Sequence, residues 1–261
     1  MAELLLGVDG GGSKTLALVA DLRGRVLGRG IGGSSNYQSV GFAAATGELE
    51  AAITDALRSA GSDSACPIAA ACFGLAGVGR PADRATFNAW LKEHGRIRRW
   101  TLVNDAEPVL AAGTPAGWGV ALICGTGSFC YGRAPDDRTS RAGGWGHLIG
   151  DEGSGYALGV QALRLATQTA DGRADAQAML HAILHHWQLS DPAELVHYVY
   201  DPARTRADIA ALAEPITALA EQGDRFAREL VDQAAYELGR MVAAVVRRLG
   251  LETPPLATGG G

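Results

Sequence analysis

A pattern that occurs twice constrains the fold of this 261-residue chain more than any other feature. An apolar segment ending at Asp9 is followed by Gly10-Gly11-Gly12-Ser13 and a second apolar segment; one ending at Cys124 is followed by Gly125-Thr126-Gly127-Ser128 and another. Each half therefore opens with a strand, a Gly-x-Gly-Ser turn and a strand. The pattern favours two related α/β halves facing each other across a cleft, each with one glycine hairpin. Because the repeat is short, coincidence is the alternative.

The rest of the first half alternates between strands and helices. Residues 42–60 carry Leu49, Ile53 and Leu57 at helical spacing, and residues 82–94 are also expected to form a helix with one apolar face. The strands expected in this half are residues 4–8, 16–20, 26–31, 68–75 and 99–104, followed by a short helix that ends near residue 110.

A stretch of Gly, Pro and Thr at residues 112–117 interrupts this pattern and predicts a domain boundary. We expect an N-terminal domain over residues 1–114 and a C-terminal domain over residues 115–261. The second domain is expected to contain strands at 119–124 and 129–133, a polar hairpin tip at 135–141, mostly helices after residue 154, and a long amphipathic helix at about 223–249.

Composition excludes several classes of protein. The net charge of −5 argues against a general nucleic-acid binder, which presents a basic face. The apolar runs are too short to cross a bilayer and the first residues lack the basic segment of a secretory leader, so we expect a cytoplasmic protein without an anchor. Cys66, Cys72, Cys124 and Cys130 form no Cys-x-x-Cys pair, so reduced thiols are expected and a zinc site is not.

The first glycine turn, from Asp9 to Thr15, is a candidate phosphate site. Its glycines expose backbone N–H groups that can hold phosphate oxygens, and Asp9 at the strand end can hold Mg²⁺ through water. The spacing fits neither a Walker A loop nor a dinucleotide-binding fingerprint. Taken alone, the motif is explained equally well by a tight β-hairpin. The equivalent turn at Gly125–Ser128 favours phosphate binding over two plain hairpins.

Asp105 follows an expected strand and is a candidate general base. A carboxylate at a strand end can accept the proton of a substrate hydroxyl. Capping the helix that follows is the more ordinary use of an aspartate there, and it is favoured when Asp105 is considered alone.

The densest group of glycines and polar residues lies at residues 143–156. Trp145 among glycines is typical of a ring that lies against a sugar or a base, and Asp151 and Ser154 stand where a helix is expected to start. Helix capping by Asp151 is the structural alternative. The crowding of these residue types favours a ligand-binding loop.

In this order and spacing, the motifs resemble those of the BadF/BadG/BcrA/BcrD ATPase family within the actin, sugar-kinase and Hsp70 superfamily. The resemblance covers essentially the whole chain and is greatest with N-acetylglucosamine kinases. It rests on Asp9–Thr15, Asn104-Asp105-Ala106, Gly125–Ser128 and Gly143–Ser154. The implied fold is α/β, with two ribonuclease-H-like domains of the actin-like ATPase type, an interdomain nucleotide cleft, and a helix-rich C-terminal part that is incomplete at its end.

The resemblance implies an ATP-dependent kinase that phosphorylates the 6-hydroxyl of N-acetylglucosamine, glucosamine or N-acetylmuramate, with Asp105 as the catalytic base and Mg²⁺ held near Asp9. The implied partners are the amino sugar and ATP, with no nucleic acid and no membrane; a homodimer stays open. The residues implied to bind ATP or its phosphates are Asp9, Gly10, Gly11, Gly12, Ser13, Lys14, Thr15, Gly125, Thr126, Gly127, Ala220, Gly259 and Gly260. Those implied to bind the sugar are Ser35, Asn36, Asp105, Ser128, Phe129, Gly144, Trp145, Gly146, Asp151 and Ser154.

Two departures from the family pattern affect these expectations. Its amino-sugar kinases carry Asn where this chain has Phe129, so one hydrogen bond to the sugar is expected to be lost. They also continue past the glycines at 259–261, so the adenosine pocket is expected to be incomplete. Two alternatives remain: an ATPase that activates a redox partner, whose relatives have clustered cysteines that this chain lacks, and a non-catalytic sugar sensor.

Overall fold

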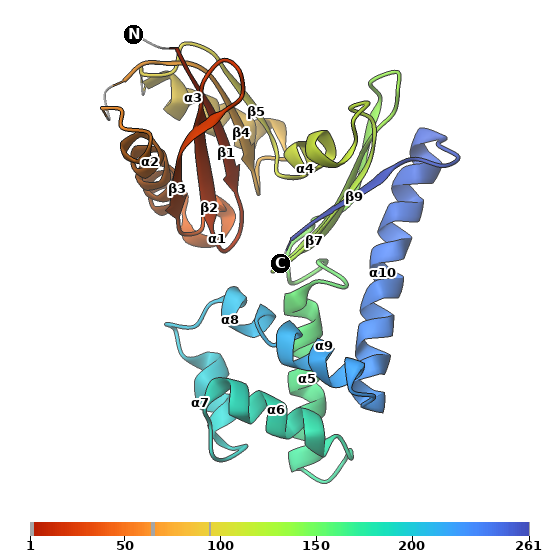
Figure 1. Ribbon diagram of the computed structural model, residues 1–261. Helices are drawn as coiled ribbons and strands as arrows, with labels where there is room; N and C mark the ends of the chain where they lie inside the picture. Colours follow the sequence, from red (N-terminus) through yellow and green to blue (C-terminus); the bar gives the residue numbers. More distant parts are fainter. Residues whose placement is uncertain (1–2, 64–65, 94, 261) are drawn as a thin grey trace. The chain divides into compact units, whose positions relative to one another are not determined.

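The computed structural model describes residues 3–63, 66–93 and 95–260, so residue 94 of the helix expected at 82–94, and Gly261, lie outside the described residues. Contacts divide the chain into two compact units, Met1–Pro108 and Val109–Gly261 (Figure 1). The division falls inside a helix, α4 (Ala106–Gly113). The domain boundary expected after residue 114 stays a prediction.

The first unit is built on a five-stranded mixed sheet in the order β3-β2-β1-β4-β5. Strand β1 pairs antiparallel with β2 and parallel with β4, and β4 pairs parallel with β5. The strands are β1 (Leu4–Gly10), β2 (Thr15–Ala20), β3 (Val26–Gly32), β4 (Ile68–Leu75) and β5 (Trp100–Asn104). All five strands expected from the apolar runs of this half are therefore confirmed. The parallel arrangement places the carboxyl ends of β1, β4 and β5 at one edge of the sheet.

Helix α2 (Phe42–Ser59) lies along β3 in Figure 1, and glycines make this close approach possible. Every second residue of β3 from Gly28 is glycine. A Cβ atom on Gly30 would lie 2.0 Å from the carbonyl oxygen of Ala52 in α2, and one on Gly28 would lie 2.1 Å from that of Ala56. The helix and the strand therefore touch backbone to backbone. The other helices that complete this unit are α1 (Tyr37–Val40) and α3 (Pro81–Glu93).

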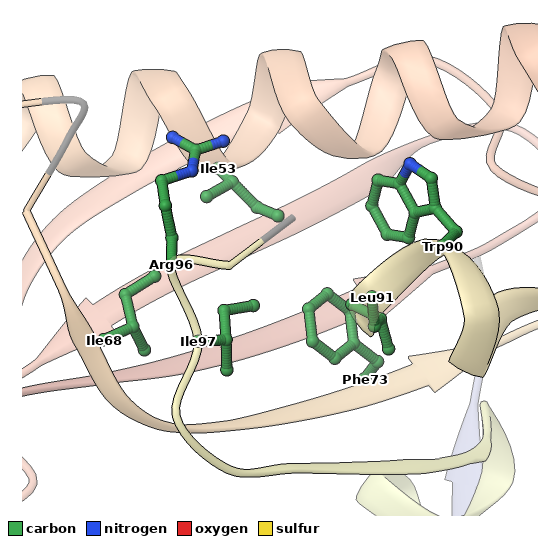
Figure 2. Close-up of a pocket in the computed structure, with 7 residues that line it drawn as sticks. All are labelled: Ile53, Ile68, Phe73, Trp90, Leu91, Arg96 and Ile97. Carbon is green, nitrogen blue, oxygen red and sulfur yellow. The ribbon is translucent and has the colours of Figure 1, made fainter. Parts of the chain in front are cut away.

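A small cavity lies in the apolar core between α2, α3 and β4 (Figure 2). Its volume is about 10 Å³, which is the space of about one water molecule. It is lined by Ile53, Ile68, Phe73, Trp90, Leu91, Arg96 and Ile97. The size and the largely apolar lining identify it as a packing void, and the functional site has to be sought elsewhere.

The second unit repeats the strand arrangement of the first. Its sheet has the order β8-β7-β6-β9, with β6 antiparallel to β7, β7 antiparallel to β8, and β6 parallel to β9. The strands are β6 (Gly119–Cys124), β7 (Ser128–Arg133), β8 (Thr139–Gly143) and β9 (Leu256–Gly259). This order and these directions match β3-β2-β1-β4, as related halves predict. The hairpin tip expected at 135–141 is wrong in its second part, because β8 already begins at Thr139.

Helices make up the rest of the second unit. The longest, α10 (Arg225–Leu249), packs on the sheet with Met241, Val245 and Leu249 buried against β6 and β7 residues. The other helices form a separate apolar core: α5 (Gly155–Ala170), α6 (Gln177–Trp187), α7 (Glu194–Tyr200), α8 (Arg206–Ala210) and α9 (Ala213–Glu221). Within the described ranges, no helix has both the length and the hydropathy to cross a bilayer.

Candidate functional site

The first glycine turn connects β1 to β2 and is held from two sides. Gly11 N donates to Lys14 O over 2.9 Å, which closes the turn. The carbonyl of Gly10 accepts from Ala76 N at 2.7 Å, and that of Gly11 accepts from Ser35 N at 3.2 Å. The loops after β3 and β4 therefore fix the turn. A Cβ on Gly12 would meet nothing within 4 Å, which leaves the tip of the turn open for a ligand.

Two residues expected to bind sugar, Ser35 and Asn36, follow β3 and lie beside this turn. Ser35 is fully buried, and its hydroxyl lies 2.9 Å from the hydroxyl of Thr15. Asn36 caps α1: its Oδ1 accepts from Gln38 N over 3.2 Å. Its amide nitrogen is the group that this cap does not use. Thr15 and Ser35 are both buried and support the turn, whereas Asn36 is partly exposed.

Asp105 and Asp9 stand at the same edge of the sheet. The register pairs Gly10 with Leu75 and Leu75 with Asn104, so the carboxyl ends of β1, β4 and β5 are level. Asp9 is the last but one residue of β1, and Asp105 directly follows β5. The structure thus brings the expected base, the expected cation-binding carboxylate and the first glycine turn together.

Burial raises the pKa of Asp105 to about 7. Its own backbone N–H opposes this shift, and the negative charge of Asp9 adds to it. Helix capping was the alternative role for Asp105, but its neighbour Asn104 makes such a hydrogen bond instead: Asn104 Oδ1 accepts from Ala106 N over 3.0 Å at the start of α4. A carboxyl whose pKa lies near neutrality can exchange a proton with a substrate at neutral pH, and such shifts are typical of functional sites.

The charges around Asp9 suit a bound cation. Burial raises the pKa of Asp9, and the ammonium of Lys14 lowers it. Two carboxylates, Asp9 and Asp105, therefore share one edge of the sheet with a single nearby ammonium. Carboxylate oxygens are the donors that Mg²⁺ prefers, and Mg²⁺ usually retains water and bridges to phosphates. Among the residues that the structure describes, no three His, Cys, Asp or Glu side chains gather into a metal site, so these two carboxylates would fit a magnesium ion whose other ligands are water or phosphate oxygens.

The second glycine turn connects β6 to β7 and is packed against Asp151. Gly125 N donates to Gly127 O over 3.0 Å, and Gly125 O accepts from Gly155 N over 2.8 Å. The Asp151 carboxylate accepts from Ser128 N over 3.4 Å. A Cβ on Gly127 would lie 3.1 Å from Asp151 Oδ2, so a larger residue there would crowd the carboxylate. Asp151 is buried and has a φ of 59°, a backbone conformation that costs free energy for a non-glycine residue.

The glycine-rich loop before α5 folds onto this turn. Ser128 Oγ donates to Glu152 O over 2.7 Å, and Ser128 O accepts from Gly144 N over 3.1 Å. Ser154 caps α5 by accepting from Ala157 N over 3.1 Å. A Cβ on Gly144 would lie 3.2 Å from Phe129 Cβ, so the Phe129 side chain covers the backbone of the loop.

Trp145 and Gly146 continue this loop. The Trp145 side chain is 61% exposed, so its ring is available to a ligand. The structure therefore gathers Ser128, Phe129, Gly144, Asp151 and Ser154 with the second turn. Residues 144–154 are called the sugar loop here, after the ligand that the sequence leads us to expect for them.

The three remaining residues expected to bind ATP are in two places, and the resemblance implies that two of them, Ala220 and Gly259, touch the nucleoside. Gly260 is next to the second turn, where a Cβ would lie 1.7 Å from Cys124 O and only glycine fits. Gly259 ends β9 and pairs with Ile123. Ala220 lies in the apolar core of the helices, where its carbonyl accepts from Arg228 Nε over 3.0 Å.

Several side chains that support these groups escaped the sequence analysis. Glu107 Oε1 accepts from Asn104 Nδ2 over 3.0 Å, beside Asp105. Arg141 NH2 donates to Gly144 O over 3.2 Å, at the start of the sugar loop. Arg206 reaches the same loop from α8. The signal for Glu107 was its position three residues after Asn104; neither arginine belongs to a recognisable motif.

Comparison with known proteins shows the family to which this chain belongs. The sequence model of the BadF/BadG/BcrA/BcrD ATPase family matches residues 6–261. An N-acetylmuramic acid/N-acetylglucosamine kinase of Clostridium acetobutylicum is 35% identical over 99% of this chain and 85% of that protein. An N-acetyl-D-glucosamine kinase of Dictyostelium discoideum is 31% identical, again over 99% of this chain and 85% of that protein.

Solved structures share the fold. A candidate N-acetylglucosamine kinase from Chromobacterium violaceum superposes with a TM-score of 0.78 at 29% identity, covering 100% of this chain and 88% of the other. A ROK family glucokinase from Streptomyces griseus, in complex with glucose and AMPPNP, gives a TM-score of 0.60 at 19% identity over 99% of this chain and 83% of the other. By sequence and by α/β architecture, this chain belongs to the BadF/BadG/BcrA/BcrD ATPase family.

Proposed function

We propose that the protein is an ATP-dependent kinase that phosphorylates the 6-hydroxyl of an amino sugar, namely N-acetylglucosamine, glucosamine or N-acetylmuramate. The observation that carries the proposal is Asp105, a carboxyl with a pKa of about 7 that stands at one sheet edge with Asp9 and the first glycine turn. The relatives at 31–35% identity, both described as amino-sugar kinases, support it.

In this mechanism Asp105 orients the sugar hydroxyl and accepts its proton. The hydroxyl oxygen forms a bond to the γ-phosphorus of ATP, the bond from that phosphorus to the β–γ bridging oxygen breaks, and ADP leaves. A base is most effective when its pKa lies near the working pH, which the value of about 7 satisfies. Asp9 would hold Mg²⁺ through water, and the ion would supply positive charge to the phosphates.

The two glycine turns hold phosphate oxygens. The first turn, Gly10–Ser13, is assigned to the phosphates together with the ammonium of Lys14, and the second turn, Gly125–Gly127, is assigned to them as well. The N–H groups of Gly11 and Gly125 close the turns themselves, so they are not among the donors. Donors fixed by the fold need no rearrangement when charge develops on the transferred group, which is why they lower the barrier. The nucleoside is assigned to Ala220, Gly259 and Gly260.

The sugar is assigned to Asn36 and to the sugar loop. Asn36 offers its amide nitrogen, because its Oδ1 is used by the α1 cap. Asp151 and the backbone of Gly144 and Gly146 offer hydrogen bonds, and the exposed Trp145 ring offers an apolar face. Ser35, Ser128 and Ser154 act through the groups that they hold, since each hydroxyl has a partner within the protein.

A coupled assay of ADP release tests the proposal. ATP and Mg²⁺ are supplied with N-acetylglucosamine, glucosamine, N-acetylmuramate or glucose, and with no sugar. A kinase releases ADP only with a sugar and prefers an amino sugar over glucose. Equal release without sugar would instead support the ATPase that activates a redox partner. Sugar binding without ADP release would support the sensor.

A further inference from the structure

Arg206, the first residue of α8, reaches the sugar loop from a distant part of the chain. Its NH1 lies 3.2 Å from Nδ1 of His147, 59 residues away in sequence. A guanidinium has only donors and stays protonated, so Arg206 donates and His147 Nδ1 accepts. The ring proton of His147 is then on Nε2. The ring also meets Tyr156 edge to face, with centroids 5.3 Å apart.

Helix α8 is fixed against the start of α5, so Arg206 approaches from a rigid support. A Cβ on Gly159 would lie 2.3 Å from Ile209 O, and one on Gly155 would lie 3.0 Å from Ala210 O. Glycines four residues apart on one face of α5 therefore admit the backbone of α8. Thr205 and Asp208 form a capping box that holds the first turn of α8.

Arg206 also acts on Asp151 by its charge. Burial raises the pKa of Asp151, whereas the Ser128 N–H and the charge of Arg206 lower it. Asp151 is buried with a positive φ, so its ionised form and its position depend on these surroundings. The cation at Arg206 thus favours the carboxylate that is assigned to the sugar.

We propose that Arg206 is a positioning residue of the sugar site: by donating to His147 and placing positive charge beside Asp151, it holds the sugar loop in its binding conformation. This inference rests on the proposed function, because it takes the loop to bind the substrate. Arg206 touches neither substrate in this scheme. Because it acts through the sugar loop, its loss should weaken sugar binding and leave ATP binding unchanged.

Three variants and a control test the proposal. Arg206→Gln removes the charge, Arg206→Lys retains it, and His147→Phe keeps the ring against Tyr156 but removes the acceptor. Arg204→Gln is the matched control, since Arg204 stacks over Tyr198 at 3.9 Å, outside the loop. The measurements are KM for each sugar, KM for ATP, kcat, the dissociation constant of N-acetylglucosamine by calorimetry, and the thermal midpoint.

Loss of a hydrogen bond to a charged group predicts a rise of about tenfold in KM and dissociation constant for the sugar with Arg206→Gln. We expect a similar rise with His147→Phe, partial rescue with Arg206→Lys, and unchanged values with Arg204→Gln. The ATP KM is expected to stay within about twofold of wild type, which a general loss of structure would not produce.

Two results would overturn the inference. One is an unchanged sugar affinity in both Arg206→Gln and His147→Phe. The other is a loss confined to N-acetylmuramate, because Arg206 would then contact the carboxylate of that sugar directly. A wild-type protein that neither binds nor phosphorylates any amino sugar would contradict the proposed function itself. A wild-type kinase with unaffected variants would contradict the inference alone.

Discussion

Asp9 raises the pKa of Asp105 across an intervening strand: Asp9 is the last but one residue of β1, Asp105 directly follows β5, and both strands flank β4. Burial is the larger cause and the charge of Asp9 adds to it. The base and the cation-binding carboxylate are therefore electrostatically linked. A cation bound beside Asp9 would offset this negative charge and lower the pKa of Asp105, so that binding of the nucleotide with its metal helps to ionise the base.

Replacing Asp105 by Asn tests its role as the base. The amide has nearly the same shape and cannot accept the proton, so we expect kcat to fall by about 10²–10⁴-fold while both substrates still bind. Coupled ADP release measures kcat, and calorimetry measures binding. Asp136→Asn, in the exposed β7–β8 turn, is the control. Near-normal turnover by Asp105→Asn would show that another group takes the proton.

The rate should depend on the ionisation of Asp105. Since the base must be deprotonated and its pKa is about 7, we expect kcat/KM to fall about tenfold for each pH unit below that value. Initial rates at low sugar concentration, measured between about pH 5 and pH 9, give kcat/KM and would show this fall. A kcat/KM that does not change across neutral pH would contradict the role of Asp105 as the base. The same pH dependence in Asp105→Asn would contradict it as well.

The same carboxyl makes stability depend on pH without reference to activity. The pKa of Asp105 in the folded protein, about 7, lies above its ordinary 3.8. The folded state therefore holds the proton more tightly, and the stability this contributes is complete below 3.8 and is lost as the pH rises to about 7. The side chain of Asp105→Asn stays neutral, so the free energy of unfolding of this variant should rise relative to wild type by about 1.4 kcal/mol for each pH unit from pH 5 up to about pH 7, and should then stay level to pH 8.

Urea titrations at the two pH values measure this change. Asp136→Asn is again the control: the Arg138 hydrogen bond lowers the pKa of Asp136, so this carboxyl is ionised in the folded and the unfolded protein over this pH range, and its replacement should give a difference that does not change with pH. A gap between Asp105→Asn and wild type that does not widen with pH would mean that the carboxyl is not held protonated by the fold.

Two glycines of the first turn should respond differently to alanine. A Cβ on Gly10 would lie 2.2 Å from Ser35 Oγ and 2.6 Å from Leu75 Cδ2, so Gly10→Ala is expected to cost about 1–3 kcal/mol of stability. Gly12 has open space, so Gly12→Ala should fold normally and instead raise the ATP KM by obstructing phosphate. Chemical denaturation and ATP titration separate the effects. Equal losses of stability would contradict the geometry.

Local patterns in the sequence predicted most of the fold. Strands β1 to β7 follow from apolar runs bounded by glycines and turn residues, and α2 and α10 follow from helical spacing. Strand β8 was missed because Thr139-Ser140-Arg141 has no apolar alternation: it is an edge strand held by backbone pairing with β7. The alternating glycines of β3 were visible, but nothing in the sequence says that α2 lies against them.

The site was predictable where short motifs form it. Glycine turns and the residues after strands can be located because each lies within a few positions of a strand end. The pKa of Asp105 was not predictable, since it depends on burial and on Asp9, about a hundred residues away. The contact of Arg206 with His147 leaves no local pattern either, because two folded segments produce it.

Two glycines, Gly30 in β3 and Gly47 in α2, should have opposite effects on stability when they are replaced by alanine. Gly30→Ala would place a Cβ 2.0 Å from Ala52 O, where backbone must move, so we expect a loss of about 3 kcal/mol or failure of the first unit to fold. Gly47, inside α2, meets nothing within 4 Å, so Gly47→Ala should gain about 0.5–1 kcal/mol from helix propensity. Thermal unfolding of both variants tests the pair, and a tolerated Gly30→Ala would refute the close contact.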